Sequence, residues 1–266
     1  MIILHVGDVM GRLGRNALSA LLPQLVSEYE ADFVIVNGEN AAGGAGITSN
    51  TAQEILAAGA GCITTGNHVW TQREALELLG KDHRILRPAN YPEGAPGVGA
   101  GVFPTQFGES LEVGVLCLCG RVFMRELDCP FRRADEEIEW LRERTPLIVV
   151  DFHAEATSEK GAFARYVDGR VSAVIGTHTH VQTADERILA RGTAFITDVG
   201  MTGATDSIIG VDPEPVLRRF VTQLPARFKP PKSGPAALCA VAVDLDSDTG
   251  QARSIERICR DMPAHS

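Results

Sequence analysis

At five places along the chain, a short apolar run is followed by, or ends in, a carboxylate, carboxamide or imidazole side chain. Apolar runs of this length are typical of buried strands, and several of the stretches between them carry the apolar spacing of helices. Strands that alternate with helices predict an α/β fold built in layers. The repeated polar ends make the ends of the strands the expected place of a functional site.

The predicted strands and helices cover most of the chain. Strands are expected at Ile2–Val6 and at residues 33–36, 62–65, 147–152, 171–175, 194–197, 238–245 and 253–258, with a hairpin formed by 102–107 and 111–118. Helices are expected at residues 15–29, 49–59, 71–79 and 136–144 and near Pro213–Thr222. Thr48 or Ser49 and Thr71 are candidate N-caps, and Pro23 is expected to kink the first helix or start a new turn. No repeat or convincing linker divides the sequence, so residues 1–266 are predicted to form a single domain.

The net charge and the composition limit the classes of partner that the chain can bind. The formal net charge is -9, so a long nucleic acid duplex is disfavoured, but a small phosphate-bearing substrate stays open because bound cations can reverse a local potential. No apolar run is long enough for a membrane span, and the amino terminus lacks the basic stretch of a secretory signal, so no membrane partner is expected. None of the six cysteines forms a C-x-x-C pair, which favours free thiols in a reducing compartment and predicts a cytoplasmic location.

Five predicted strands end in residues that could carry chemistry. In chain order these are Asp8, Glu39 with Asn40, Asn67 with His68, His153, and the GTHTH pair His178 and His180. Ligand sites in α/β sheets gather at the carboxyl ends of strands, so the five loops are expected to meet in one crevice. If GTHTH is extended, alternation places both of its histidines on one side.

These residue types are the ones that hold divalent metal ions. Carboxylate and carboxamide oxygens with neutral imidazoles suit iron, manganese or zinc better than a calcium cage or a thiolate zinc site. The seven candidate ligands among these residues, which do not include His68, exceed the needs of one ion, whereas two ions that share a bridging carboxylate use them all. Each residue alone has a structural alternative, with Asp8, Asn40 and Asn67 in turns and His153 in the core. Their joint occurrence at five strand ends favours the metal site.

Other polar residues receive a structural interpretation. His5 lies inside the first predicted strand and is expected in the core or behind a ligand, while His83 and His265 are not ligand candidates. Asp151 shares a strand face with the candidate ligand His153, two residues further on, and could orient its ring. For both Asp151 and Asp198, however, capping or turn roles are favoured.

Six stretches of the sequence resemble one known family. They are GDVMGRLGR, VNGENAAGG, TTGNHVW, LRPANYPEGAPG, DFHAEATSEK and VIGTHTHVQTADERIL. Their order resembles the calcineurin-like metallophosphoesterase superfamily, and more closely its YmdB-like branch of bacterial phosphodiesterases. The likeness extends from Asp8 to beyond Gly200. It implies the α/β fold of that superfamily, in which two β-sheets pack as a sandwich and helices flank them.

The resemblance also implies a ligand set and a reaction. One ion would be held by Asp8, Glu39, Asn40 and His180. The other would be held by Glu39, Asn67, His153 and His178. Glu39 would bridge the ions, which the family implies to be iron, with manganese or zinc as alternatives. His68 would stay free of metal and act as the general acid while a metal-bridging hydroxide attacks phosphorus. The implied substrates are small phosphodiesters, 2′,3′-cyclic nucleotides in particular.

Two positions depart from the wider superfamily. The usual first loop carries Asp-x-His, whereas this chain has Asp8-Val9-Met10 and lacks the histidine. The usual bridging aspartate is replaced by Glu39, and Asn40 is expected to supply the ligand that the missing histidine would have given. Both departures fit the YmdB-like branch.

Two other classes of function stay open. A metal-dependent amidohydrolase or esterase uses similar ligands, although the paired H-x-H expected near its first strand is absent here. A metal-dependent nucleotide-binding regulatory protein with little turnover would need no proton donor such as His68. A homo-oligomer, which is common among soluble enzymes, stays open as well.

Overall fold

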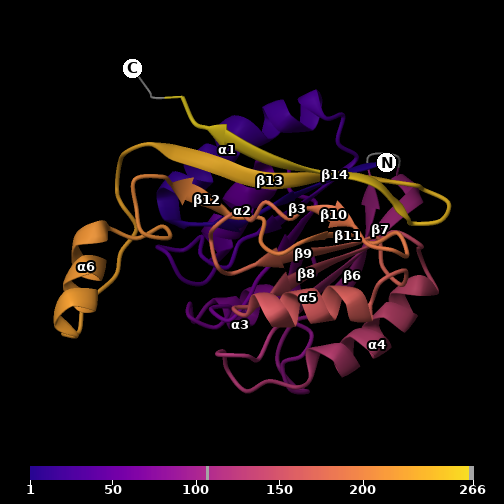
Figure 1. The fold of residues 1–266 in the computed structure, drawn as a ribbon, viewed down its shortest axis with the longest axis horizontal. Helices are drawn as coiled ribbons and strands as arrows, with labels where there is room; N and C mark the ends of the chain where they lie inside the picture. Colours follow the sequence, from indigo (N-terminus) through magenta and orange to yellow (C-terminus); the bar gives the residue numbers. More distant parts are fainter. Residues whose placement is uncertain (106–107, 264–266) are drawn as a thin grey trace.

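The computed structural model describes residues 1–105 and 108–263. Two sheets face each other across an apolar layer, and helices cover their outer sides (Figure 1). The layers therefore follow the order helix, sheet, sheet, helix, which confirms the predicted sandwich of two sheets flanked by helices.

The first sheet contains the amino-terminal strands. Its strands lie in the order β2 (Asp8–Val9), β12 (Met201–Ala204), β13 (Ala236–Leu245), β1 (Ile2–Val6), β3 (Phe33–Asn37), β4 (Cys62–Thr64) and β5 (Ile85–Leu86), with β14 (Ala252–Asp261) on the other side of β13. Strands β1, β3, β4 and β5 are parallel, so their carboxyl ends meet at one edge. β13 runs antiparallel to β1 and β14.

The second sheet is built mostly from the middle of the chain. Its strands lie in the order β10 (Arg187–Ile188), β11 (Ala194–Ile196), β9 (Ala173–Thr177), β8 (Ile148–His153), β7 (Gly108–Cys119) and β6 (Ala100–Thr105). Strands β7, β8, β9 and β11 are parallel. The predicted hairpin is present as the antiparallel pair of β6 and β7, although residues 106 and 107 of its expected first strand lie outside the described residues.

The helices close the outer faces of the sandwich. Helices α1 (Gly11–Glu28), α2 (Ser49–Ala57) and α3 (Ala75–Lys81) pack on the first sheet. Helices α4 (Pro130–Arg142) and α5 (Thr157–Tyr166) pack on the second. Helix α6 (Pro213–Thr222) instead stands away from both sheets (Figure 1).

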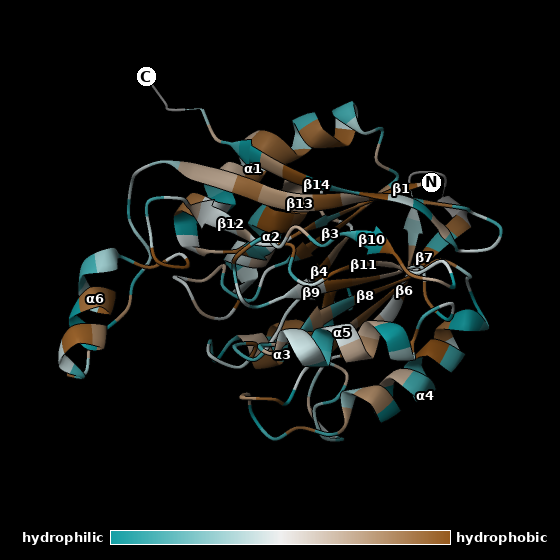
Figure 2. Ribbon diagram, in the orientation of Figure 1, coloured by the Kyte–Doolittle hydropathy of each residue, from teal (hydrophilic) through white to brown (hydrophobic). Residues whose placement is uncertain are grey.

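Alternation along β1 shows how the layers form. Leu4 and Val6 face the helices, whereas Ile3 faces the layer between the sheets. His5 shares the face of Ile3 and is fully buried, so a polar side chain enters the apolar layer and needs a partner there. Figure 2 shows the same division, with hydrophobic residues along the central strands and both colours on the helices. Within the described residues, no helix is both long and apolar enough to cross a membrane.

Several element boundaries differ from the predicted ones. α1 begins four residues before the expected start and continues through Pro23 as one helix, so the expected new turn is absent. α3 begins at Ala75, after a series of turns, so the prediction of Thr71 as its N-cap is wrong. α4 starts at Pro130, because proline fits the first turn, where its missing N–H is not needed. Thr48 caps α2 through a capping box, as expected.

Candidate metal centre

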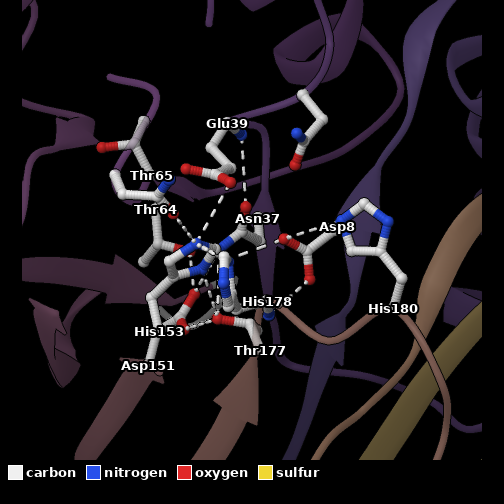
Figure 3. A network of polar contacts seen from close by, with 12 residues as sticks. Asp8, Asn37, Glu39, Thr64, Thr65, Asp151, His153, Thr177, His178 and His180 are labelled. Atoms are coloured by element: carbon white, nitrogen blue, oxygen red, sulfur yellow. Dashed lines mark hydrogen bonds and ion pairs between the residues drawn. The ribbon is translucent and has the colours of Figure 1, made fainter. Parts of the chain in front are cut away.

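The predicted site residues meet where parallel strands of both sheets end, and Figure 3 labels Asp8, Glu39, His153, His178 and His180 among them. They come from β2, from the loops after β3, β4 and β9, and from the last position of β8, and they are Asp8, Glu39, Asn40, Asn67, His68, His153, His178 and His180. The expected convergence of five strand ends is therefore present, with each sheet contributing part of the cluster.

The cluster is centred on the imidazole of His153. Its Nε2 lies 3.1 Å from Glu39 Oε1, 2.9 Å from Asn67 Oδ1 and 3.1 Å from His178 Nδ1. The ligand atoms of Glu39, His153 and His178 all lie within 4.8 Å of one another, which is the spacing that one metal ion needs. Several lone pairs directed at one small volume repel one another, and a cation would turn that repulsion into attraction.

A glycine makes this close approach possible. A Cβ atom at Gly66 would lie 2.3 Å from His153 Nε2 and 2.4 Å from Glu39 Oε2, which are overlaps that side chains do not tolerate. Gly66 is therefore required by the packing of the centre and not by its backbone angles.

A second group of potential ligands surrounds Asp8, which is fully buried. Its Oδ2 accepts a hydrogen bond from His178 N at 3.2 Å, and its Oδ1 lies 3.8 Å from His180 Nε2. Asp8 Oδ1 and Asn40 Oδ1 are buried without a hydrogen-bond donor among the described residues. Because a buried oxygen without a partner is costly, a cation bound here fits the donor set that the chain provides.

Two histidines are held in the tautomer that a metal ligand requires. The Thr177 hydroxyl donates to Asp151 Oδ1 at 2.7 Å, so its oxygen accepts from His153 Nδ1 at 2.9 Å. Similarly, His180 Nδ1 lies 2.8 Å from the carbonyl oxygen of Ile209, which can only accept. In both neutral imidazoles Nε2 then keeps its lone pair and faces the centre.

Asp151 joins the centre to the layer between the sheets. Its Oδ2 accepts from Asn37 Nδ2 at 3.0 Å and from the Thr64 hydroxyl, and lies 3.6 Å from His5 Nε2. Burial acts to raise the pKa of Asp151, but His5, His153 and the hydrogen bond from Thr64 bring it below its ordinary value. The capping role predicted for Asp151 is wrong, because the carboxylate is fully buried and reaches His153 through Thr177. His5 lies behind the ligands, which is one of the two positions expected for it.

A buried ion pair between Lys160 and Asp198 holds the loop that carries His178 and His180. Lys160 Nζ donates to Asp198 Oδ2 and to Thr177 O, at 2.7 Å in each case, and Asp198 Oδ2 also accepts from Thr179 N at 3.0 Å. His178 and His180 have φ angles of 97° and 65°, which are uncommon for residues other than glycine. The expected extended GTHTH segment is therefore wrong, and the two rings reach the centre from a sharply turned loop.

The sequence predicted only part of the role of Asp198 and did not indicate that Lys160 contributes to the site. Asp198 Oδ1 accepts from Gly200 N at 2.8 Å, which is the predicted turn, but its other oxygen pairs with Lys160. Lys160 lies in α5, for which no helix was predicted, and it is fully buried. Nothing in the local sequence distinguishes a buried lysine from the usual exposed one.

The protonation behaviour of the cluster reflects its crowding. Burial acts to lower the pKa of His153, but the carboxylates of Glu39, Asp8 and Asp151 outweigh it and raise that pKa to about 9. Burial acts to raise the pKa of Glu39, but His153 and His68 lower it to about 2. Burial raises the pKa of Asp8 to about 6 despite its histidine neighbours.

His68 lies at the rim of the cluster. Its backbone N–H donates to Glu39 Oε2 at 3.0 Å, which holds His68 next to the Glu39 carboxylate. Its half-buried side chain lines a cleft of about 700 Å³, together with Asn40 and His180. His68 thus faces open space, whereas His153 is fully enclosed. Of the remaining histidines, His83 is exposed, and His265 lies outside the described residues.

Two facing sheets with this cluster at their strand ends define the fold of a metallophosphoesterase. The chain belongs to the YmdB-like protein family, which matches residues 4–258. A 2′,3′-cyclic-nucleotide 2′-phosphodiesterase from Bacillus subtilis (strain 168) is 48% identical over 258 residues, which are 97% of this chain and 96% of that protein.

Two solved structures share the fold over nearly their whole length. A hypothetical protein from Thermus thermophilus has a TM-score of 0.91 and 40% identity, over 99% of this chain and 100% of its own. A structure described as a novel phosphatase from Mycoplasma pneumoniae has a TM-score of 0.90 and 36% identity, over 98% and 93% respectively. The prediction of a phosphoric diester hydrolase is confirmed as the class of enzyme, and the family is one of metal-dependent phosphoesterases.

Proposed function

We propose that the chain hydrolyses small phosphodiesters, in particular 2′,3′-cyclic nucleotides, at a centre of two divalent metal ions within a single domain of residues 1–266. The observation that carries this proposal is the convergence of Glu39, Asn67 and His178 on His153 Nε2, beside two buried oxygens that no donor among the described residues reaches. The relative from Bacillus subtilis, named for 2′,3′-cyclic nucleotides, supports the substrate class.

The ligands divide into two sets around Glu39. Asp8, Asn40 and His180 would hold one ion, in agreement with the Asp8 and Asn40 oxygens that have no donor in the part of the chain that the structure describes. Asn67, His153 and His178 would hold the other, and Glu39 would bridge the two. The oxygen- and nitrogen-rich set suits iron, with manganese or zinc as alternatives. When bound, the ions supply positive charge that lowers the pKa of a water molecule and offsets the negative charge at phosphorus.

The side chains of this protein have separate tasks in the reaction. The Thr177 and Ile209 oxygens keep His153 and His180 in the tautomer with a free Nε2. His68 donates a proton to the departing oxygen, since its ring faces the cleft and its backbone is tied to Glu39. In a 2′,3′-cyclic nucleotide, an oxygen of water forms a bond to phosphorus, the bond from phosphorus to the ribose 2′-oxygen breaks, and that 2′-oxygen takes the proton. The product is a nucleoside 3′-monophosphate.

Hydrolysis of three substrates tests the proposal. Protein loaded with manganese or iron would be assayed with 2′,3′-cyclic AMP, 3′,5′-cyclic AMP and a simple phosphomonoester. We expect turnover of 2′,3′-cyclic AMP to exceed that of the monoester, with 3′-AMP as the product. Tight nucleotide binding without turnover, in protein shown to carry metal, would replace the proposal by a nucleotide-binding regulatory protein.

A further inference from the structure

A long arm leaves the first sheet between β12 and β13 and carries α6 (Figure 1). It spans residues 205–235, and its two sides meet where Asp212 N donates to Lys229 O at 2.9 Å. Arg12 Nη2 ties the arm to α1 by donating to Lys232 O at 2.9 Å. The arm exposes large apolar side chains, among them Phe220, which is 74% exposed. Because the arm leaves these large apolar side chains exposed, we expect it to have a function beyond supporting the fold.

The arm forms one wall of the cleft that His68 lines. The opposite wall carries His68, Asn40 and His180, so the cleft opens directly onto the candidate metal centre. The arm contributes mostly apolar side chains, among them Ile209, Val216, Phe220, Phe228 and Pro230, together with the cation Arg219 and the amide of Gln223. None of the described residues that line the cleft is acidic, although the chain has a net charge of -9. The wall therefore suits a flat apolar group close to an anion.

The arm packs against the glycine-rich stretch that follows β3, residues 41–46. A Cβ atom at Gly44 would lie 2.8 Å from Pro230 Cγ, and one at Gly11 would lie 3.0 Å from the same atom. Pro230 thus packs on bare backbone beside the metal centre. The AAGGAG sequence, which matches no phosphate-binding motif, acquires a structural reason, because larger residues at Gly44 would push the arm outward and change the width of the cleft.

The chemistry of the substrate decides which side of the centre receives the nucleoside. The general acid must contact the leaving oxygen, and in a cyclic nucleotide that oxygen belongs to the ribose. The carbon next to this position carries the base, so the base must lie on the side of His68. A second hollow of about 300 Å³ borders Asn67 and His178 and includes the exposed Phe123, but His68 is not among its lining residues.

We propose that the cleft between His68 and the arm is the nucleoside subsite, with Phe228 as the aromatic platform on which the base stacks; this rests on the function proposed above. The Arg219 guanidinium lies 5.3 Å from the Phe228 ring centroid and supports that ring. Stacking on an aromatic face accepts every base, so the subsite selects nucleosides as a class and favours the larger purines.

A comparison of two cyclic diesters tests the subsite. Metal-loaded protein would be assayed with 2′,3′-cyclic AMP and with glycerol 1,2-cyclic phosphate, which has the same five-membered ring and no base. The measured quantity is the ratio of the two kcat/KM values. We expect Phe228→Ala to lower this ratio about tenfold, through KM, because the stacking contact is lost. Phe228→Tyr should keep the ratio, and so should Phe123→Ala, a matched loss of an exposed aromatic ring on the other side of the centre.

A ratio that survives in Phe228→Ala, or that collapses in Phe123→Ala, would overturn the assignment of the subsite. Hydrolysis of neither diester by the wild type would instead overturn the proposed function. In that case, saturation-transfer NMR with adenosine and metal-free protein still decides the subsite. Transfer to the adenine protons that disappears in Phe228→Ala supports it, and transfer that persists refutes it.

Discussion

The two sides of the candidate centre are built in opposite ways. On the ligand side, Asp8, Asp151, His153 and Lys160 are fully buried, and each is fixed by contacts from another strand or helix. On the arm side, the cleft is lined by side chains such as Ile209, 52% exposed, and Phe228, 39% exposed, on an element whose hydrogen bonds to the rest of the described residues include those from Arg12 to Lys232 O and between His180 and Ile209 O. The same chain thus combines a pre-organised set of candidate ligands with a more exposed wall.

This difference assigns different tasks to the two sides. Metal ligands need positions accurate to a fraction of an ångström, and rigid strands with supporting hydrogen bonds provide them. Substrates must enter and leave, so a wall with few buried contacts is suited to that side. Substitutions on the ligand side should therefore change metal binding and stability, and those facing the cleft should change turnover and substrate choice. The four predictions below test that division.

His68→Ala should have the largest effect and should act on turnover alone. Loss of a general acid lowers kcat by about 10²- to 10⁴-fold, while both ions should remain bound because His68 is not among the proposed ligands. Assays would compare 2′,3′-cyclic AMP with a nitrophenyl diester, whose leaving group needs no proton. An equal loss on both substrates, or a loss of metal measured by mass spectrometry, would remove His68 from the role of acid.

Lys160→Met should have the largest effect on stability. The substitution leaves Asp198 buried without its cation, so the free energy of unfolding should fall by about 3 to 5 kcal/mol, as measured by urea denaturation. Lys81→Met is the matched control, because Lys81 pairs with Glu77 on the surface of α3, where solvent screens the pair and its contribution to stability is small. Equal effects of the two substitutions would mean that the buried pair does not hold the histidine loop.

Thr177→Val should weaken metal binding without a comparable loss of fold. Valine keeps the shape of threonine but cannot link Asp151 to His153, so the His153 tautomer is no longer fixed. Loss of such a supporting group lowers metal affinity by about 10- to 100-fold. Calorimetric titration with manganese would measure the change, with Thr71→Val as a control in a turn before α3. Unchanged affinity would show that the linkage to Asp151 does not matter for the ligand.

The smallest effect concerns the stability of metal-free protein as a function of pH. The pKa of His153 is raised to about 9 in the folded state from an ordinary 6.5, so its contribution is complete below pH 6.5 and is lost as pH rises through 9. The melting temperature of the chelated protein should therefore decrease as the pH rises from 6.5 to 9. His153→Asn should flatten that slope. A melting temperature of the wild type that stays level across this range would show that the buried carboxylates do not hold a proton on His153.

The sequence indicated which residues gather at the candidate centre, because this signal is local. Each candidate ligand lies at or shortly after the end of an apolar run, and the carboxyl ends of parallel strands in one sheet meet, so Asp8 and Glu39 could be placed together without coordinates. His153 ends a strand of the other sheet, so its approach to them depends on how the two sheets pack. The outer helices were harder, since α4 begins at Pro130 and α5 carries a weak apolar pattern. The short strands β2, β5, β10 and β12 are pairing partners and have no periodicity to detect.

Lys160 and the arm escaped prediction for a different physical reason. A buried lysine differs from a surface lysine only through contacts made across the fold, here with Asp198 and Thr177. The bounds of α6 were predicted as Pro213–Thr222, and the structure has the same ones. Its position opposite His68 was not predictable, because it depends on Pro230 packing against Gly44 and not on any local pattern.

The most direct measurement is anomalous X-ray scattering from crystals of the manganese-loaded protein. We expect two anomalous peaks in each chain. One should lie among Asp8, Asn40 and His180 and the other among Asn67, His153 and His178, with a carboxylate oxygen of Glu39 next to each. A single peak, or a peak away from Glu39, would show that these strand ends do not form a two-metal centre.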